Sequence, residues 1–236
     1  MAQVFYSGWE GGSDYKNTGG TGVFSYGSAG SLSRNTSSPL ADVADLKQDG
    51  SSIGYVMNVL SKNIMGLVCR IKLTAESLGN GERAQFFYIL GPYVAPSYKY
   101  LCRAYFLDDN GTLKVQFRFY NGTAWGTIGT PITISSGTEY QVELLHNRNT
   151  KVGGKVWVAN GGSQVGSTQE ETVGVQDYAA GRYYVGPVSV CDASVTYQLD
   201  DFKVDDADYP GPYVSGGNAP TGGLYGPLFG PLGGPI

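Results

Sequence analysis

Hydrophobic and polar residues alternate with a period of two along much of this chain, which is the pattern of strands with one buried face. In the segment 114–119, the apolar phase holds Val115, Phe117 and Phe119, and the polar phase holds lysine, glutamine and arginine. The same alternation predicts strands over 63–74, 84–90, 100–107, 140–145 and 155–158. Each of these segments is expected to turn one face to a core and the other to solvent.

Strong turn signals separate the predicted strands, at Asp109-Asn110-Gly111, Asn121-Gly122 and Asn160-Gly161-Gly162. Such pairs favour tight hairpins because both residues tolerate positive φ. No segment shows a sustained helical period, although a short helical turn is expected within 38–48, where Pro39 suits a first helical position. The chain is therefore predicted to be all-β, with antiparallel strands in a sandwich or barrel.

The buried phase changes near the acidic stretch 198–206. Val195 and Leu199 occupy odd positions, whereas Phe202 and Val204 occupy even ones. A strand keeps one face buried across such a change only if it contains an extra residue, so a β-bulge is predicted at Asp200-Asp201. The two carboxylates would then point away from the core near the end of a sheet, where they either cap backbone amides or help to hold a cation.

The composition changes at about residue 207, which divides the chain into a body over 1–206 and a Gly/Pro-rich C-terminal arm over 207–236. Proline lacks a backbone donor and glycine costs entropy to order, so the arm cannot build a core of its own. It is either a disordered end or a segment that orders against a neighbouring subunit. In the second case, its apolar residues make the subunit contact: Leu224, Tyr225, Leu228, Phe229, Leu232 and Ile236.

Composition and charge narrow the function classes. Charged residues make up 15% of the chain, against about 25% in ordinary soluble domains, and the net charge of −4 argues against nucleic acid as a partner. The first ten residues contain no basic start followed by an apolar run, so synthesis in the cytoplasm without a signal peptide or membrane span is expected. The three cysteines, Cys69, Cys102 and Cys191, are widely spaced and are expected to be buried thiols.

Catalytic chemistry has few candidates. His146 is the only histidine, and its position where a strand gives way to a turn predicts a surface location. Glu139 and Glu143 stand four residues apart on one strand, about 13 Å, which exceeds the carboxylate spacing of about 5–9.5 Å that glycosidases need. An enzyme, such as a polysaccharide hydrolase or lyase, is therefore the least favoured function.

Aromatic residues are the better candidates for binding. Tyrosine and tryptophan on a sandwich surface either stack on sugars or anchor a protein interface, because they bring large area at low entropy cost. The candidate residues for glycan or protein contact are Tyr93, Tyr98, Trp125, Trp157, Tyr183 and Tyr184.

Three segments together carry a family resemblance: the opening "VFYSGWEGGS", the hairpin "GTEYQVELLHNRNTKVGGKVWVANG" and the closing "GRYYVGPVSVCDASVTYQLDDFKVDDADYPGP". In order and spacing they resemble the concanavalin A-like lectin/glucanase superfamily, the laminin-G-like jelly rolls, over roughly residues 4–206. The resemblance implies a two-sheet antiparallel jelly-roll sandwich with a concave face, in which the opening and closing strands are neighbours. The Glu-x-Asp-x-x-Glu strand of laminarinase-like members is missing.

In some relatives the opening turn and the closing strand meet around a structural calcium ion. Carried over, this implies calcium ligands at Glu10, the Gly12 carbonyl and Asp201, because oxygen ligands of this kind suit Ca²⁺. The alternative is that these acids only accept backbone hydrogen bonds. No other cofactor is expected.

The resemblance and the layout together predict a non-enzymatic structural protein of a virus particle, such as a bacteriophage capsid decoration, fibre or tail component. Its expected partners are other virion proteins such as the major capsid protein, copies of itself in a homo-oligomer such as a trimer, and a host-surface glycan. The alternative is a carbohydrate-binding lectin module, which the fold permits without proving.

Overall fold

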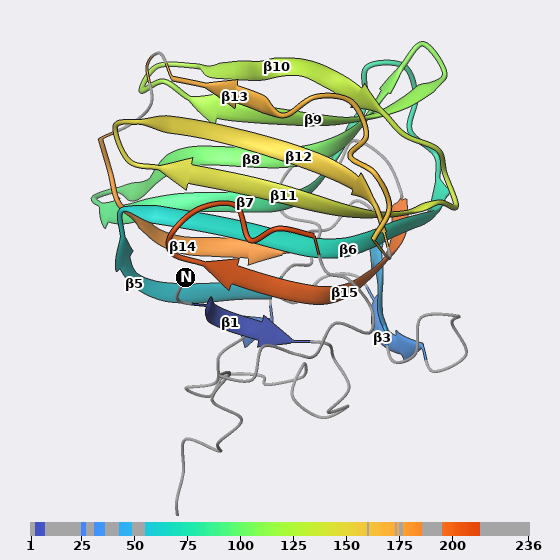
Figure 1. Ribbon diagram of the computed structural model, residues 1–236, viewed down its shortest axis with the longest axis horizontal. Coiled ribbons are helices and arrows are strands. Elements are labelled where there is room, and N and C mark those ends of the chain that lie inside the picture. Colours follow the sequence, from blue (N-terminus) through green and yellow to red (C-terminus); the bar gives the residue numbers. More distant parts are fainter. Residues whose placement is uncertain are drawn as a thin grey trace, which may run out of the picture.

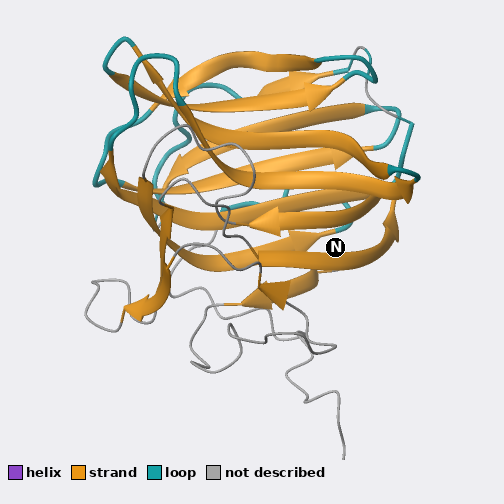
Figure 2. Ribbon diagram, turned by 180° about the vertical axis from the view of Figure 1, so that it is seen from behind, coloured by secondary structure: helices purple, strands orange, loops and turns teal. Residues whose placement is uncertain are grey.

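The computed structural model describes residues 3–7, 25–26, 31–35, 43–48, 55–159, 161–172, 174, 177–185 and 195–212. All the regular structure in these ranges is β, as Figure 2 shows by its strand and loop colours. The strands are β1 (Gln3–Ser7), β2 (Ser25–Tyr26), β3 (Ser31–Asn35), β4 (Val43–Gln48), β5 (Tyr55–Lys62), β6 (Ile64–Glu76), β7 (Arg83–Val94), β8 (Ser97–Asp109), β9 (Thr112–Tyr120), β10 (Trp125–Thr133), β11 (Glu139–Asn147), β12 (Lys151–Val158), β13 (Gln169–Glu171), β14 (Ala180–Val185) and β15 (Val195–Asp205). No helix in the described ranges is long and apolar enough to cross a membrane.

The strands form two antiparallel sheets. The first sheet has the order β13-β12-β11-β6-β15-β4-β3, with β1 also paired to β15, and the second has the order β10-β9-β8-β7-β14-β5-β2. Figure 1 shows the sheets stacked face to face, with β6, β11 and β15 in the nearer layer. The predicted all-β, two-sheet sandwich is confirmed.

The predicted β-bulge is confirmed in β15. Between Asp200 and Lys203, β15 advances three residues while its partner β6 advances only two, from Arg70 to Val68. On the other edge of β15, residues 195–199 pair with β4 and residues 202–205 pair with β1. The extra residue therefore lies where one edge of β15 changes partner, and the opening and closing strands are neighbours as the resemblance implied.

The core lies between the two sheets and is built from the apolar phases of the strands. Val115, Phe117 and Phe119 are all buried, as predicted, together with aromatic residues of β7 and β8. The buried thiols are confirmed for Cys69 and Cys102, and Cys191 lies outside the described residues.

The expected helical turn within 38–48 is wrong for its second half. Residues 43–48 form β4, which pairs with β3 on one edge and β15 on the other, and residues 38–42 lie outside the described part. A strand here forms backbone hydrogen bonds with β3 and with β15, whereas a single helical turn would leave the facing backbone groups of those strands without partners. This outweighs the local signals of a helix start.

The segment that follows β15 folds back over the outer face of the first sheet, where it crosses in front of β6 in Figure 1. Tyr209 and Pro210 are buried there, and Lys155 Nζ lies 3.9 Å from the centre of the Tyr209 ring. A Cβ atom at Gly153 would overlap the Tyr209 hydroxyl, and one at Gly66 would overlap Pro210. The first residues of the C-terminal arm thus pack on the chain's own sandwich, and the predicted contact residues 224–236 lie outside the described part.

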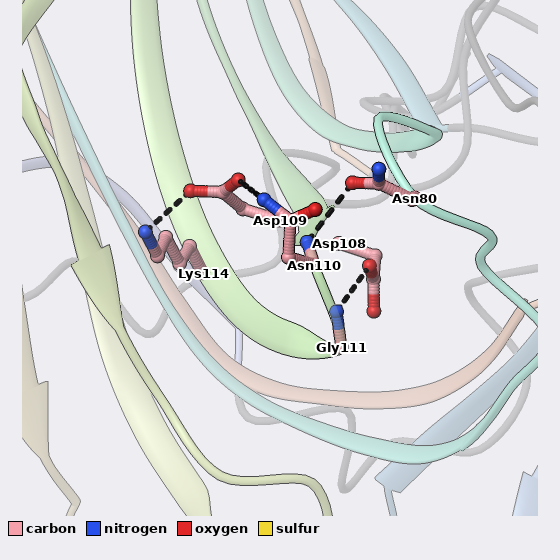
Figure 3. Close-up of polar contacts among 6 residues, drawn as sticks. All are labelled: Asn80, Asp108, Asp109, Asn110, Gly111 and Lys114. Atoms are coloured by element: carbon pink, nitrogen blue, oxygen red, sulfur yellow. Dashed lines mark hydrogen bonds and ion pairs between the residues drawn. The ribbon is translucent and has the colours of Figure 1, made fainter.

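The turn between β8 and β9 is held by several polar contacts, which Figure 3 shows. Asn110 and Gly111 both have positive φ, the Gly111 amide donates to Asp108 at 2.9 Å, and the Asn110 amide donates to Asn80 at 2.9 Å. Lys114 closes the turn with an ion pair to Asp109 at 2.6 Å. The predicted turn is confirmed; Asp109 pairs with Thr112, so the loop has two residues and fixes the register of β8 against β9.

Candidate functional site

Five aromatic side chains from five neighbouring strands gather on the outer surface of the second sheet. We call this group the aromatic face: Tyr88, Tyr100, Tyr120, Trp125 and Tyr184. The ring of Tyr100 lies 5.4 Å from that of Tyr120 and 5.8 Å from that of Trp125, and Tyr88 lies 6.1 Å from Tyr184, centre to centre. These residues occupy the strand phase opposite to the core, so their side chains leave the sheet on its far side.

Two predicted contact residues, Trp125 and Tyr184, belong to the aromatic face. Tyr93 and Tyr98 lie in the β7–β8 hairpin with their rings 5.2 Å apart, and Tyr93 is 58% exposed. The guanidinium of Arg182 lies 4.2 Å from the Tyr98 ring centre and 3.4 Å from the Tyr184 hydroxyl. Four of the six predicted residues are thus connected on one side of the molecule.

The other two predicted contact residues lie elsewhere. Tyr183 is fully buried in the core, so the prediction of a surface contact there is wrong: neighbouring strand residues face opposite sides, and Tyr184 takes the outward one. Trp157 is half-buried on β12 of the first sheet, where its Nε1 donates to Glu143 at 2.9 Å.

Beside the aromatic rings, the second sheet carries a group of paired polar side chains that we call the polar floor: Gln85, Arg103, Tyr105, Gln116 and Arg118. Arg103 is only 8% exposed, and its guanidinium carbon lies 3.9 Å from the centre of the Trp125 ring. Tyr105, which is fully buried, donates its hydroxyl to Gln116. One row of directly paired residues crosses four strand pairs on this face: Thr127, Arg118, Arg103, Tyr88 and Tyr184.

The polar floor carries positive charge that the described residues do not neutralise. Arg103 and Arg118 stand directly opposite each other on β8 and β9, and neither forms an ion pair with any described carboxylate. Burial lowers the pKa of the Arg103 guanidinium, and the nearby charges of Arg118 and Arg83 act in the same direction. The nitrogens Arg103 Nε, Arg118 Nε and Gln85 Nε2 are buried without a hydrogen-bond acceptor in the described part of the chain, each at a cost of about 1–3 kcal/mol.

The acid–base candidates lie away from this face. His146 is fully buried, contrary to the predicted surface position, and its Nε2 donates to the Tyr178 carbonyl at 2.8 Å. Glu143 keeps its outward phase but is also fully buried, because the segment around Tyr209 covers that sheet. Glu139 forms an ion pair with Arg70 at 3.1 Å.

The structure describes the backbone of one of the three predicted calcium ligands and leaves the other two undescribed. Glu10 and Gly12 lie outside the described residues, and Asp201 is described only as part of strand β15. Among the residues with described side chains, no group of three or more His, Cys, Asp and Glu is placed to hold a metal ion. The calcium site therefore stays a prediction.

The six predicted contact residues leave out the floor and part of the aromatic face, in particular Tyr88, Tyr100, Tyr120, Gln85, Arg103 and Arg118. A usable signal was present in the predicted Asn110-Gly111 turn. A two-residue turn there pairs position 109 with 112, and counting back along both strands pairs 103 with 118. Two arginines on the solvent phase of paired strands are unusual, because like charges directly opposite each other are destabilising.

Comparison with known proteins shows the fold and no closer relationship. No protein-family model matches the chain, and no curated protein matches it. Solved structures that are similar include an endo-β-1,4-glucuronan lyase from the fungus Trichoderma reesei, with 13% identity and a TM-score of 0.54 over 88% of this chain and 98% of that chain.

Two bacteriophage proteins are similar at the same level. A carbohydrate esterase from Shiga toxin-encoding bacteriophage phi24B has 12% identity and a TM-score of 0.57, covering 86% of this chain and 97% of its own. The CBM2 module of the evolved Dit protein of Lactobacillus casei BL23 phage J-1 has 10% identity and a TM-score of 0.57, covering 86% and 94%. These likenesses establish a jelly-roll-like β-sandwich, and membership of the concanavalin A-like superfamily stays a prediction.

Proposed function

We propose that this chain is a non-catalytic, glycan-binding sandwich and that the aromatic face holds the sugar. The observation that carries the proposal is the grouping of Trp125, Tyr100 and Tyr120, with ring centres 5.4–5.8 Å apart, beside buried polar groups. Aromatic rings offer an apolar surface for the C–H faces of a pyranose, while their hydroxyls and the neighbouring polar groups bond its hydroxyls. Tyr100 is 42% exposed, so this surface is open to a ligand.

The similar structures support the proposal without identifying a sugar. They include a glucuronan lyase, a phage carbohydrate esterase and a CBM2 module, and an arabinanase domain in complex with arabinotriose has 13% identity and a TM-score of 0.56. Sandwiches of this shape thus serve carbohydrate chemistry in several unrelated settings.

Replacing Trp125 with alanine is expected to raise the dissociation constant for the glycan at least tenfold, which is about 1.4 kcal/mol of binding free energy. The variant removes the ring that contacts both Tyr100 and Tyr120 in the aromatic face. A glycan array on the full chain identifies the sugar that binds, and titration calorimetry with that sugar then measures the dissociation constant of the variant.

The matched control is Trp157→Ala, which removes a half-buried tryptophan from the other sheet and should leave the affinity unchanged. Circular dichroism of both variants checks that the sandwich is intact. An array without signal for the wild-type chain, or equal losses in the two variants, would count against the proposed site.

We further propose that the chain acts in a virus particle, as a bacteriophage capsid decoration, fibre or tail component that contacts other virion proteins. Two of the similar structures come from bacteriophages, and the weakly charged chain ends in an apolar, Gly/Pro-rich arm. The arm is suited to bind a neighbouring copy, in a symmetric homo-oligomer such as a trimer.

Light scattering of the full chain and of a chain ending at residue 212 tests the role of the arm. The cut spares Tyr209 and Pro210, which pack on the first sheet, so the sandwich itself should stay folded. We expect an oligomer for the full chain and a monomer for the shortened one. Monomers in both cases, with no binding to purified particles, would refute this assembly role.

A further inference from the structure

We infer that the ligand of the aromatic face is an acidic glycan, whose carboxylate or sulfate group binds at Arg103 and Arg118. We call these two residues the arginine pair. The inference rests on the proposed glycan-binding function and adds the chemical class of the sugar.

The first argument is the missing counter-charge. Arg103 and Arg118 are direct cross-strand partners, and their guanidinium groups repel each other in the absence of an anion. Two other arginines of the described chain do have a carboxylate partner: Arg70 binds Glu139 at 3.1 Å and Arg148 binds Asp177 at 2.6 Å. The arginine pair has no carboxylate partner among the described residues. Arg103 is also buried, so water screens its charge less than it screens a surface cation.

The second argument is the type of hydrogen-bonding group left over. The three buried nitrogens without an acceptor in the described part of the chain, on Arg103, Arg118 and Gln85, are all donors. A neutral sugar hydroxyl both donates and accepts, whereas a carboxylate or sulfate only accepts, with several oxygens at once. The unsatisfied groups of the floor are therefore all donors, and they match an acidic group better than a hydroxyl.

The third argument is the position of Arg103 next to the sugar-stacking ring. Its guanidinium lies 3.9 Å from the centre of Trp125, and a guanidinium that packs on an aromatic face keeps its N–H groups in its own plane for ligands. A sugar ring on the aromatic face would thus carry its acidic substituent toward the arginine pair. The nearest acids along β8, Asp108 and Asp109, are engaged in the turn with Gly111 and Lys114.

The test compares charged and uncharged forms of the same sugars on the full chain. An array presents uronate, sialylated and sulfated oligosaccharides beside their uncharged counterparts, which are carboxyl-reduced, desialylated or desulfated. We expect the best acidic glycan to bind about tenfold more tightly than its uncharged form, with an affinity that falls as salt is added. Whether the signal comes from carboxylates or from sulfates identifies the acidic group.

Variants then assign the preference to the arginine pair. By calorimetry with the best acidic glycan, Arg118→Gln and Arg103→Gln should each lose about tenfold in affinity, and each should lose less for the uncharged form, because that form lacks the acidic group. Arg103→Lys should recover part of the loss, because it restores the charge without the planar fork. Arg148→Gln, in the turn between β11 and β12 of the first sheet, is the control and should bind as the wild type does.

The outcomes separate the two proposals. Equal binding of charged and uncharged sugars, or full affinity for the acidic glycan in Arg118→Gln, overturns the inference and leaves the glycan-binding function in place. No binding of any sugar overturns both. Arg118 is only part-buried, so its variant remains informative if the more buried Arg103→Gln fails to fold.

Discussion

Replacing Gly154 with alanine is expected to lower the free energy of unfolding by about 3 kcal/mol, the upper part of the range for overpacked cores. Gly154 lies in β12 and faces the second sheet, where a Cβ atom would overlap three atoms of the Phe117 ring. That ring is itself fully buried in the core, so it cannot swing into solvent. Unfolding in urea, monitored by tryptophan fluorescence, gives the change in midpoint and in free energy.

The ring of Phe117 is the proposed cause, so shortening it should relieve the effect. The double variant Gly154→Ala with Phe117→Leu should be more stable than the sum of the two single changes allows, with a coupling energy above about 0.5 kcal/mol. Gly79→Ala is the matched control, because its Cβ would lie at an ordinary 3.4 Å from the flexible Glu82 side chain. Strict additivity would show that another contact limits the space at Gly154.

Much of the fold could be predicted because strand patterns depend on local order. The apolar phase of Phe117 and its neighbours and the bulge near Asp200 follow from which side chains must face a core. The Asn110-Gly111 turn follows from two adjacent residues that tolerate positive φ. None of these features needs knowledge of a distant segment. The helical turn expected within 38–48 failed for the opposite reason, since β4 exists by pairing with β15, about 150 residues further along the chain.

Burial on the outer faces could not be predicted in the same way. The alternation places Glu143 on the outward phase correctly, but it does not reveal that Tyr209 returns to cover that face. His146 lies at the end of a strand, which predicts exposure, yet the loop of Tyr178 packs over it. A strand pattern shows which way a side chain points, and only the tertiary fold shows what lies there.

The candidate site was predictable in its parts and not in its assembly. Trp125 and Tyr184 were identified as surface aromatics, but they are more than 50 residues apart in sequence, and only the strand order of the second sheet brings them together. Within one hairpin, the register already pairs Arg103 with Arg118. The stacking of Arg103 on Trp125 adds the third strand, β10, and so requires the sheet as a whole.

His146 is expected to make the stability of the protein fall as the pH drops from about 6.5 to about 4. Burial lowers the pKa of His146 from the usual 6.5 to about 4 in the folded state. Between these values the unfolded chain binds a proton that the folded chain does not, so acid favours unfolding. The full difference corresponds to about 3 kcal/mol, present above pH 6.5 and lost as the pH falls toward the folded value.

The hydrogen-bond pattern explains why the imidazole stays neutral. Nε2 donates to the Tyr178 carbonyl, so Nδ1 would have to take the extra proton, and Nδ1 has no hydrogen-bond partner in the described part of the chain. Urea unfolding of the wild type and of His146→Gln at pH 7.5, 5.5 and 4.5 measures the contribution as the difference between the two curves. His146 is the only histidine, so no other imidazole titrates in this range, and the carboxylates are the same in both proteins. Parallel stability curves would mean that the His146 ring is protonated in the folded state after all.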